Sequence, residues 1–380
     1  MRRIPGVLFL LGILPGFAAA ATPPPPLTDT AYEFPGAVPS PGSAASAGVG
    51  LSDRWLGDEP FENPAVPPRR VGVLSPLLYH MSRQDLRGFN RSYSEQSAFF
   101  DGAGAWFGGK AGGLGYFLYG HQPVLRLEEN AYLTGPQSGS PAPVENSTST
   151  REMRGGAGVS WAMGIVRFGL AGEWTYRDDS YRTVDRSGSP LSGSSEVSFS
   201  GSAVGGQAGA RAELGPEGAG HLTVGAAVRF VPELEVTGDQ VANLVSGNSS
   251  GPVRATRESG IESGMSARWS ASPQVRLLAG VGLRTGQEWQ GFGVTRGGGG
   301  SWGIGLDFHD SRDPWTLRIG GGETSERGVH EPRNGIFGLG FGWIMESTTL
   351  DLSAVRHSFS HLGAATSYDD RVLASVTLAY

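Results

Sequence analysis

The chain of 380 residues contains no cysteine and only one lysine, Lys110. Without a sulfur ligand or nucleophile it has no disulfide framework, no cysteine-ligated zinc or iron–sulfur site, no thiol nucleophile and no lipid-anchored N-terminal cysteine. Beyond the first 21 residues, no charge-free apolar run approaches the roughly 18 residues that a membrane-spanning helix needs. The formal net charge of −6 is mild, so no nucleic acid or other polyanionic partner is indicated.

Glycine, in contrast, is abundant. It supplies 61 of the 380 residues, more than twice the usual share of roughly 7 %. The glycines follow no strict every-third-residue period, which excludes collagen, and a hydrophobic content of 38 % argues against disorder. An ordinary helical enzyme is not expected from this composition.

The N-terminus is typical of an export signal. Arg2 and Arg3 form a charged region, residues 7–14 an apolar core too short to span a bilayer, and residues 18–21 a small-residue cleavage site. We therefore expect a signal peptide over residues 1–21.

The remaining chain divides into two parts that differ in composition and in the alternation of apolar and polar residues. Residues 22–70 are rich in Pro, Ala, Ser and Gly and show no alternation, which indicates a linker or a segment ordered only by what it packs against. From residue 71 to residue 380 apolar and small or polar residues alternate, as in Phe337–Gly338–Leu339–Gly340, which is the period of a β-strand.

The alternation predicts an all-β fold of fourteen antiparallel strands. Long polar connections are expected at residues 82–96, 134–150, 179–194 and 238–253, and short ones after most even-numbered strands, as in bacterial outer-membrane barrels. An even strand number places both ends of the barrel in the periplasm. The fourteen predicted strands cover residues 71–81, 97–108, 112–133, 151–163, 166–178, 195–213, 220–237, 254–271, 274–289, 297–309, 315–326, 333–346, 348–360 and 367–380.

The last strand favours a membrane barrel over a soluble sandwich. Its apolar face runs from Val372 through Val376 and Leu378 to a terminal aromatic residue, Tyr380. This resembles the C-terminal strand signal that the barrel assembly machinery reads, so that machinery and outer-membrane lipid are the expected partners.

The faces opposite the apolar ones carry many charges, which a dry core would bury at several kcal/mol each. A wet or plugged lumen accommodates them, either as an anion-attracting channel or, in the reading we favour, as the normal polar interior of a barrel. The predicted lumen-lining residues are Arg167, Glu173, Arg211, Arg229, Arg268, Arg276, Arg284, Asp307, Arg318, Asp351 and Arg371.

Catalytic motifs carry little weight here. Two G-x-S-x-G matches, at residues 247–251 and 299–303, precede no helical pattern, although the nucleophile elbow requires a strand turning into a helix. His357 and His361 would lie about 13 Å apart on a strand, too far for one metal ion. We expect no enzyme activity, no metal and no cofactor.

A short segment before the first strand carries a family resemblance. A Gly- and Ala-rich run at residues 44–55 leads to an acidic stretch and then to Asn63-Pro64-Ala65. This resembles the N-terminus of the FadL-type outer-membrane proteins, which include long-chain fatty acid and aromatic hydrocarbon transporters and the related PorV-like secretion-associated barrels. The resemblance implies fourteen strands around an N-terminal plug, the hatch, in which Asn63, Pro64 and Ala65 would lie and move.

In transporters of this family the third strand is kinked and opens laterally into the membrane. The matching strand here contains Gly120 and Pro123, and proline cannot donate to a strand ladder. A lateral gate at Gly120 and Pro123 is one interpretation; a simple bulge above the membrane is the other.

The leading functional hypothesis is a plugged barrel that passes a small hydrophobic ligand and releases it sideways. The external loops are modest and residues 22–70 show no amphipathic helix, which departs from the fatty acid transporters. Two alternatives stay open: a non-transporting PorV-like scaffold for secretion or surface partner proteins, and an aqueous porin.

Overall fold

A computed structural model describes residues 55–67, 70–74, 79–84, 93–95, 104–132, 144–185, 193–245, 247–290, 294–296, 298–309, 314–326, 333–360 and 367–379. The predicted signal peptide, residues 1–21, and the rest of the chain up to residue 54 lie outside these ranges. In the described ranges no helix is long and apolar enough to cross a membrane.

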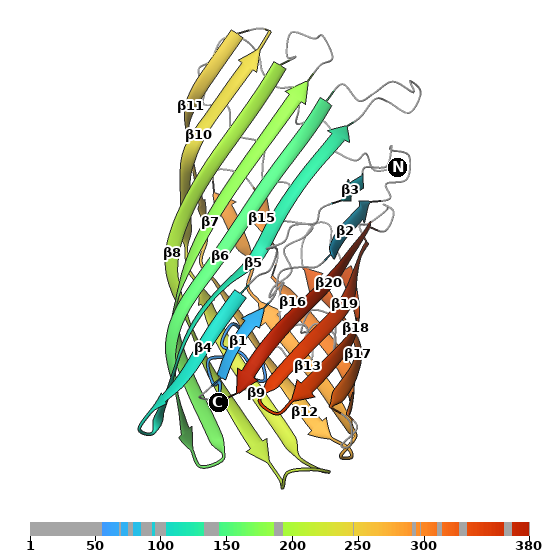
Figure 1. The fold of residues 1–380 in the computed structure, drawn as a ribbon. Helices are drawn as coiled ribbons and strands as arrows, with labels where there is room; N and C mark the ends of the chain where they lie inside the picture. Colours follow the sequence, from blue (N-terminus) through green and yellow to red (C-terminus); the bar gives the residue numbers. More distant parts are fainter. Residues whose placement is uncertain are drawn as a thin grey trace, which may run out of the picture.

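The described chain is built of β-strands, arranged as a tilted wall around a central space (Figure 1). The first ten are β1 (Arg70–Leu74), β2 (Tyr79–Gln84), β3 (Tyr93–Glu95), β4 (Gly104–Ala111), β5 (Leu114–Tyr132), β6 (Val144–Met163), β7 (Val166–Asp185), β8 (Gly193–Leu214), β9 (Leu222–Val231) and β10 (Leu234–Leu244). The others are β11 (Gly247–Arg257), β12 (Gly260–Ser270), β13 (Val275–Arg284), β14 (Gln287–Gln290), β15 (Val294–Arg296), β16 (Gly299–His309), β17 (Trp315–Glu326), β18 (Arg333–Met345), β19 (Thr348–Ser360) and β20 (Ser367–Ala379).

These twenty strands form one antiparallel sheet. Twelve of them are consecutive halves of six longer strands, namely β1 with β2, β3 with β4, β9 with β10, β11 with β12, β13 with β14, and β15 with β16, so the wall contains fourteen strands in the described chain. Strand β1 pairs with β20 on one side and β4 on the other, which returns the pairing to its start. The predicted fourteen-stranded antiparallel barrel is confirmed.

The alternation in sequence separates two surfaces of the wall. On β18, Phe337 and Leu339 are 50 % and 47 % exposed on the outer face, whereas Gly338 and Gly340, which alternate with them, are buried. Strands β7, β12, β13 and β16 repeat this pattern with Leu, Ile, Val, Met and Trp outside. An apolar outer belt with an inner face of small and charged residues is the arrangement of a transmembrane barrel.

One side of the wall is much taller than the other. Strand β8 has 22 residues and β18 has 13, which corresponds to about 73 and 43 Å along the strands; Figure 1 shows β5 to β8, β10 and β11 rising above β17 to β20. The long polar connections predicted at residues 179–194 and 238–253 are therefore wrong in most of their length, because β7, β8, β10 and β11 occupy those residues.

The outer face of the tall side explains this error. Trp174 on β7 and Val204 on β8 are 44 % and 72 % exposed. Tyr176 stacks on Trp174, and beyond it the outward positions include Asp178 and Arg182 on β7 and Ser198 on β8. These strands therefore leave the apolar belt at Trp174 and Tyr176 and continue with a largely polar surface, which removes the apolar alternation on which the prediction depended.

The alternation also changes phase along three strands. Inward positions are odd-numbered in β9 and even-numbered in β10, with Pro232 and Glu233 between the two strands. The same change occurs between β11 and β12 and between β13 and β14. Each interruption keeps the buried side chains on the inner surface at the height where the tall side of the wall begins.

Candidate functional site

Residues 55–67, here called the plug, lie inside the barrel and are almost entirely buried. Asn63 at their centre is 0 % exposed. Its Nδ2 donates to the carbonyl oxygens of Trp55 at 2.5 Å, Ala210 on β8 at 3.2 Å and Ala226 on β9 at 3.3 Å, and its Oδ1 accepts from Ala65 N at 2.9 Å. One amide thus fixes the plug's own turn and joins it to the wall.

Inward glycines leave the room that the plug occupies. A Cβ added to Gly209 on β8 would collide with the Asn63 side chain and would lie 2.9 Å from Pro64 Cδ. A Cβ at Gly169 on β7 would collide with the Pro64 carbonyl, and one at Gly225 on β9 with the Trp55 carbonyl. Part of the glycine excess therefore serves close approach of the plug to three adjacent strands.

An aromatic pocket on β4 and β5 receives Phe61 of the plug. The Phe61 ring contacts Trp106 and Tyr119 edge to face, at centroid distances of 5.4 and 5.7 Å. It also contacts the His121 ring in a tilted arrangement at 4.7 Å. Phe61, Trp106 and Tyr119 are at most 6 % exposed. Such edge-to-face contacts add to the free energy of apolar burial.

A charged layer joins the plug to β7, β9 and β12; we call it the lower charged layer. Arg229 Nη1 lies 3.1 Å from Glu62 Oε2 of the plug and 3.5 Å from Glu262 Oε2, and Arg229 Nε lies 3.5 Å from Glu173 Oε1. Arg229 Nη2 also donates to the Phe61 carbonyl. Tyr119 OH donates to Glu173 Oε2 at 2.8 Å, which links this layer to the aromatic pocket.

Toward the short turns, Asp58 of the plug bridges two wall arginines. Asp58 Oδ1 lies 2.6 Å from Arg211 Nη1, and Asp58 Oδ2 lies 2.8 Å from Arg268 Nη1. Both arginines line an open vestibule of about 840 Å³, in which Arg318 pairs with Asp307 and Asp351. This end of the lumen is polar and accessible to water.

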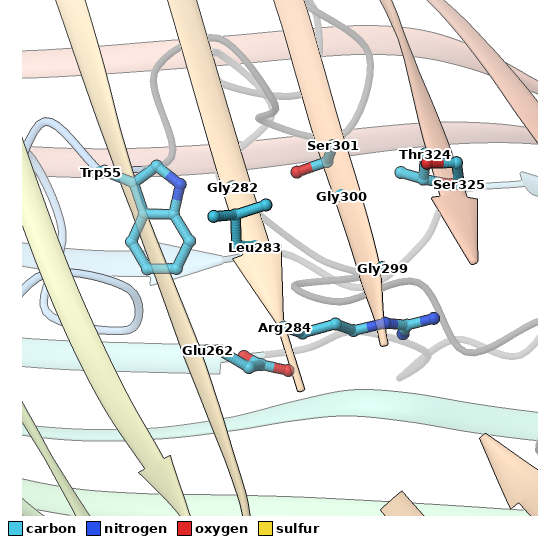
Figure 2. A pocket seen from close by; sticks show the side chains of 10 residues that line it. All are labelled: Trp55, Glu262, Gly282, Leu283, Arg284, Gly299, Gly300, Ser301, Thr324 and Ser325. Carbon is cyan, nitrogen blue, oxygen red and sulfur yellow. The ribbon is translucent and has the colours of Figure 1, made fainter. Parts of the chain in front are cut away.

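A much smaller cavity lies between Trp55 of the plug and strands β13, β16 and β17 (Figure 2). Its volume of about 20 Å³ is enough for one water molecule. The Trp55 indole nitrogen lies where a Cβ of Gly264 would be. The plug therefore fills this side of the lumen almost completely.

A second group of charges lies farther from the short turns than the lower charged layer does, and we call it the upper charged layer. It consists of Glu152 and Arg154 on β6, Arg177 and Asp179 on β7, and Arg257 on β11. Glu152 Oε1 lies 2.7 Å from Arg154 Nη2, and Arg177 Nε lies 2.7 Å from Asp179 Oδ2. Glu152 Oε2 lies 3.5 Å from Arg257 Nη1 and 3.8 Å from Arg177 Nη1.

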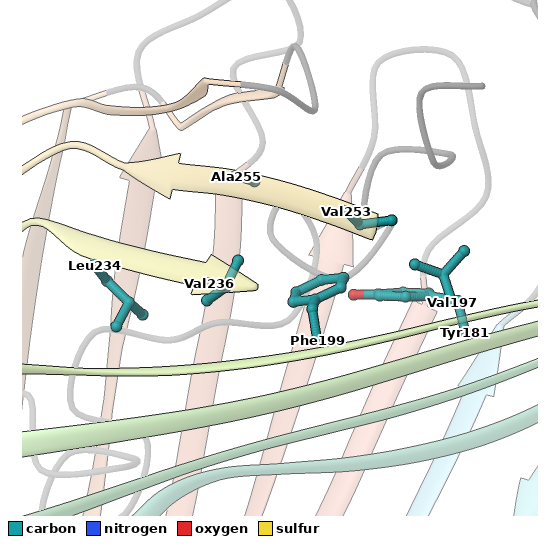
Figure 3. Packing of buried hydrophobic residues seen from close by; sticks show 7 residues of the cluster. All are labelled: Tyr181, Val197, Phe199, Leu234, Val236, Val253 and Ala255. Carbon is teal, nitrogen blue, oxygen red and sulfur yellow. The ribbon is translucent and has the colours of Figure 1, made fainter. Parts of the chain in front are cut away.

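An apolar part of the inner face begins beside this layer, where Phe199 pairs with Asp179 and Leu234 with Arg257, and continues away from the short turns. Tyr181 and Phe199 stack with ring centroids 5.9 Å apart, and aliphatic residues of β8, β10 and β11 pack beside them (Figure 3). The whole cluster consists of Tyr181, Val197, Phe199, Leu234, Val236, Val253 and Ala255, and all seven are buried.

The register of β5 is broken beside the upper charged layer. His121 is opposite Arg154 and Val124 is opposite Glu152, so β5 carries one extra residue there. Gly120 and Pro123, the predicted gate residues, flank or occupy this bulge; Gly120 is exposed, and the Pro123 side chain lies outside the described residues.

Comparison with solved structures fits this geometry. The toluene transporter TodX of Pseudomonas putida superposes with a TM-score of 0.62 at 13 % identity over 92 % of this chain and 100 % of that one. A Pseudomonas aeruginosa FadL homologue gives 0.63 at 12 % over 90 % and 99 %, and the CymD monoaromatic hydrocarbon channel 0.60 at 11 % over 92 % and 99 %. The chain has a FadL-type fold. No family model and no curated protein matches the sequence.

Within this FadL-type fold the predicted hatch residues Asn63, Pro64 and Ala65 lie in the plug. The predicted lumen residues fall into three groups. Glu173 and Arg229 belong to the lower charged layer, Arg284 lines the small cavity beside Trp55, and the Arg371 side chain lies outside the described residues. Seven line the vestibule: Arg167, Arg211, Arg268, Arg276, Asp307, Arg318 and Asp351.

The upper charged layer was not foreseen from the sequence. Arg177 lies within the predicted strand 166–178 and shares the odd-numbered inward positions that include Glu173, whereas Asp179 lies one residue beyond the predicted end of that strand. No such pattern points to Arg257. Inward positions are odd-numbered in β11 and even-numbered in β12, so the alternation of β12 does not predict that Arg257 faces inward. In the described part of the chain, no group of three or more acidic or histidine residues could hold a metal ion.

Proposed function

We propose that this protein passes small hydrophobic compounds across the outer membrane and releases them sideways at the β5 bulge. The FadL-type fold supports this, since solved structures with that fold are described as toluene transporters and a monoaromatic hydrocarbon channel. Aromatic hydrocarbons are the substrate class that we infer, because the pocket around Phe61 is itself aromatic.

The observation that carries the proposal is the position of that pocket. Phe61 contacts His121, the last residue of β5 before the register breaks. A planar hydrophobic ligand that replaced the Phe61 ring would therefore lie directly beside the bulge. Displacing Phe61 would also pull on the plug, which couples ligand arrival to movement of Asn63, Pro64 and Ala65.

Energetics favour a sideways route over an axial one. An apolar compound gains about 25 cal/mol for each Å² removed from water, and it would lose this gain among the buried ion pairs of the two charged layers. On the outside, the exposed Trp174 marks the rim of the apolar belt, and Gly155 opposite Trp174 also pairs with Gly120. A ligand leaving at the bulge would enter lipid at that rim.

The test changes the residue count at the bulge. Deleting Pro123 removes the extra residue and allows β5 to pair with β6 without a break, whereas Pro123→Ala keeps the extra residue and serves as the control. We expect uptake of radiolabelled toluene by cells expressing the deletion variant to fall by about tenfold or more, with uptake through Pro123→Ala close to wild type. Heat-modifiable migration of both variants in gels verifies folding.

Equal uptake by the folded deletion variant and wild type would refute lateral release. An aqueous porin predicts large steady conductance of the wild type in planar bilayers, which the filled lumen disfavours. A non-transporting scaffold predicts no uptake above background in any variant.

We further propose that both ends of the barrel face the periplasm and that the final strand, β20, is recognised by the barrel assembly machinery. The start of β1 is opposite the end of β20, at the same end as the two-residue turn that joins β18 to β19. Tyr380 lies outside the described residues.

A further inference from the structure

We propose that the upper charged layer is a second seal of the lumen, separate from the plug, which blocks ions and turns hydrophobic ligands toward the β5 bulge. The seal is argued from the layer's own contacts, whereas the route that it imposes on a ligand rests on the proposed function.

The contact between Glu152 and Arg257 spans the part of the lumen that β6 to β11 enclose. Glu152 is on β6 and Arg257 on β11, and pairing runs from β6 through β7, β8 and β10 to β11. Three strands thus separate the two residues along the wall, yet Glu152 Oε2 and Arg257 Nη1 lie 3.5 Å apart. The two side chains reach each other through the interior.

Burial makes this connection hard to open. The side chains of Arg177 and Asp179 are 0 % exposed, that of Glu152 is 2 % exposed and that of Arg257 is 6 % exposed. A buried charge that loses its partner is strongly unfavourable, so the members of the layer hold one another in place. Gly201 on β8 pairs with Arg177, and a Cβ added there would collide with the Glu235 carbonyl of β10, so the missing side chain allows close approach of that neighbouring strand.

The layer's position separates it from the plug. Arg177 lies four residues beyond Glu173 on β7, farther from the short turns, with Thr175 between them. The ion pairs of the lower charged layer include Glu62 of the plug, whereas those described for the upper layer join wall residues to one another. These four ion pairs therefore do not pass through a residue of the plug.

The same position directs a ligand. The apolar cluster borders the layer, since Leu234 pairs with Arg257 and Phe199 with Asp179, and it continues away from the short turns at Tyr181. Glu152 within the layer is opposite Val124, where β5 resumes pairing after its bulge. A hydrophobic compound that moves along the cluster toward the short turns reaches the charged side chains of the layer beside the β5 bulge. The apolar path that remains leads out through the wall at the bulge.

The first test measures single-channel conductance in planar bilayers. Arg257→Ala cuts the cross-lumen contact while Glu152 keeps Arg154 and Arg177, and Arg254→Ala is the control, an outward arginine of the same strand whose side chain is 70 % exposed. A variant lacking residues 55–67 should stay within about twofold of wild type, and adding Arg257→Ala should raise its conductance about tenfold or more. Adding Arg254→Ala should not.

Two outcomes overturn the proposal: excision of the plug alone opens the channel fully, or the combined variant stays closed. If the excised chain does not fold, the full-length chain decides. Because the protein has no native cysteine, Thr175→Cys provides a single thiol just below the layer. A charged, membrane-impermeant thiol reagent applied outside cells should label it about tenfold faster with Arg257→Ala than with Arg254→Ala, and equal rates refute the seal.

These readouts use ions and a thiol reagent and no hydrophobic ligand. Loss of the proposed transport function would therefore appear in the toluene assay and leave the seal standing. If there is no seal, the conductance and labelling experiments show it, and the toluene uptake assay still tests the transport function independently.

Discussion

At the scale of single residues, one buried amide holds the plug's own turn and joins it to the wall. Asn63 donates to two wall strands and accepts from the plug's own backbone, and its side chain is completely buried. Asp58 of the plug, for comparison, forms ion pairs with two wall arginines, Arg211 and Arg268, so that loss of one arginine leaves the other ion pair. Removing the Asn63 side chain takes the donor from the Trp55 carbonyl and the acceptor from Ala65 N, both within the plug's own turn.

We predict that Asn63→Ala loosens the plug by about 1–3 kcal/mol without unfolding the barrel, because the lost bonds are buried and local. Hydrogen exchange of peptides covering residues 55–67 should become about tenfold to a hundredfold faster, while exchange in β17 to β20 should not change. Asn243→Ala, at the exposed end of β10, is the control. Unchanged exchange in the plug would contradict this role.

At the scale of elements, each strand that contacts the plug has two faces with different requirements. On β8, Gly209 faces the plug and Ala208 faces outward. A larger residue at Gly209 occupies the volume of Asn63 and Pro64, whereas a larger residue at Ala208 extends into lipid. Glycine is therefore needed on the inner face because the plug packs against it, and the strands do not need it in order to form.

We predict that Gly209→Leu displaces the plug and that Ala208→Leu does not, because overpacking a filled site forces its contents to move. The reporter is Ala65→Cys, a buried plug position in a chain with no other thiol. Thiol labelling in detergent should be about tenfold faster with Gly209→Leu than with Ala208→Leu. Equal rates would mean that the plug tolerates the added side chain.

At the scale of the whole molecule, the wall is uneven: the strands from β5 to β8 exceed the apolar belt and those from β17 to β20 do not. Apolar residues alone define the part within lipid, because about 25 Å of a barrel wall is apolar. The polar extension then belongs on the side opposite the short turns, which we propose to be the cell exterior.

Cysteine labelling of intact cells tests this orientation. Ser198→Cys lies on the outer face of the tall extension, and Ala271→Cys lies in the short turn between β12 and β13. We expect an impermeant thiol reagent to label Ser198→Cys on intact cells and Ala271→Cys only after the outer membrane is permeabilised. The reverse pattern would invert the proposed topology.

The sequence by itself determined the strand period, the fourteen-stranded barrel and the two surfaces of the wall. Alternation with a period of two is local, and a strand in lipid must show it on one face. The resemblance to the FadL-type N-terminus also predicts Asn63, Pro64 and Ala65 as hatch residues. Where the outer face is polar, at residues 179–185 and in most of 238–253, the same criterion fails and predicts loops in place of strands.

Only the tertiary structure decided which interior residues meet. The pairs Glu152 with Arg257, Glu62 with Arg229 and Asp58 with Arg268 join segments 105, 167 and 210 residues apart. No local pattern encodes such distances along the chain, because they arise when the wall closes and its inner side chains share one enclosed space. The strands follow from the spacing of apolar residues, whereas the plug's contacts and the two charged layers follow from closure.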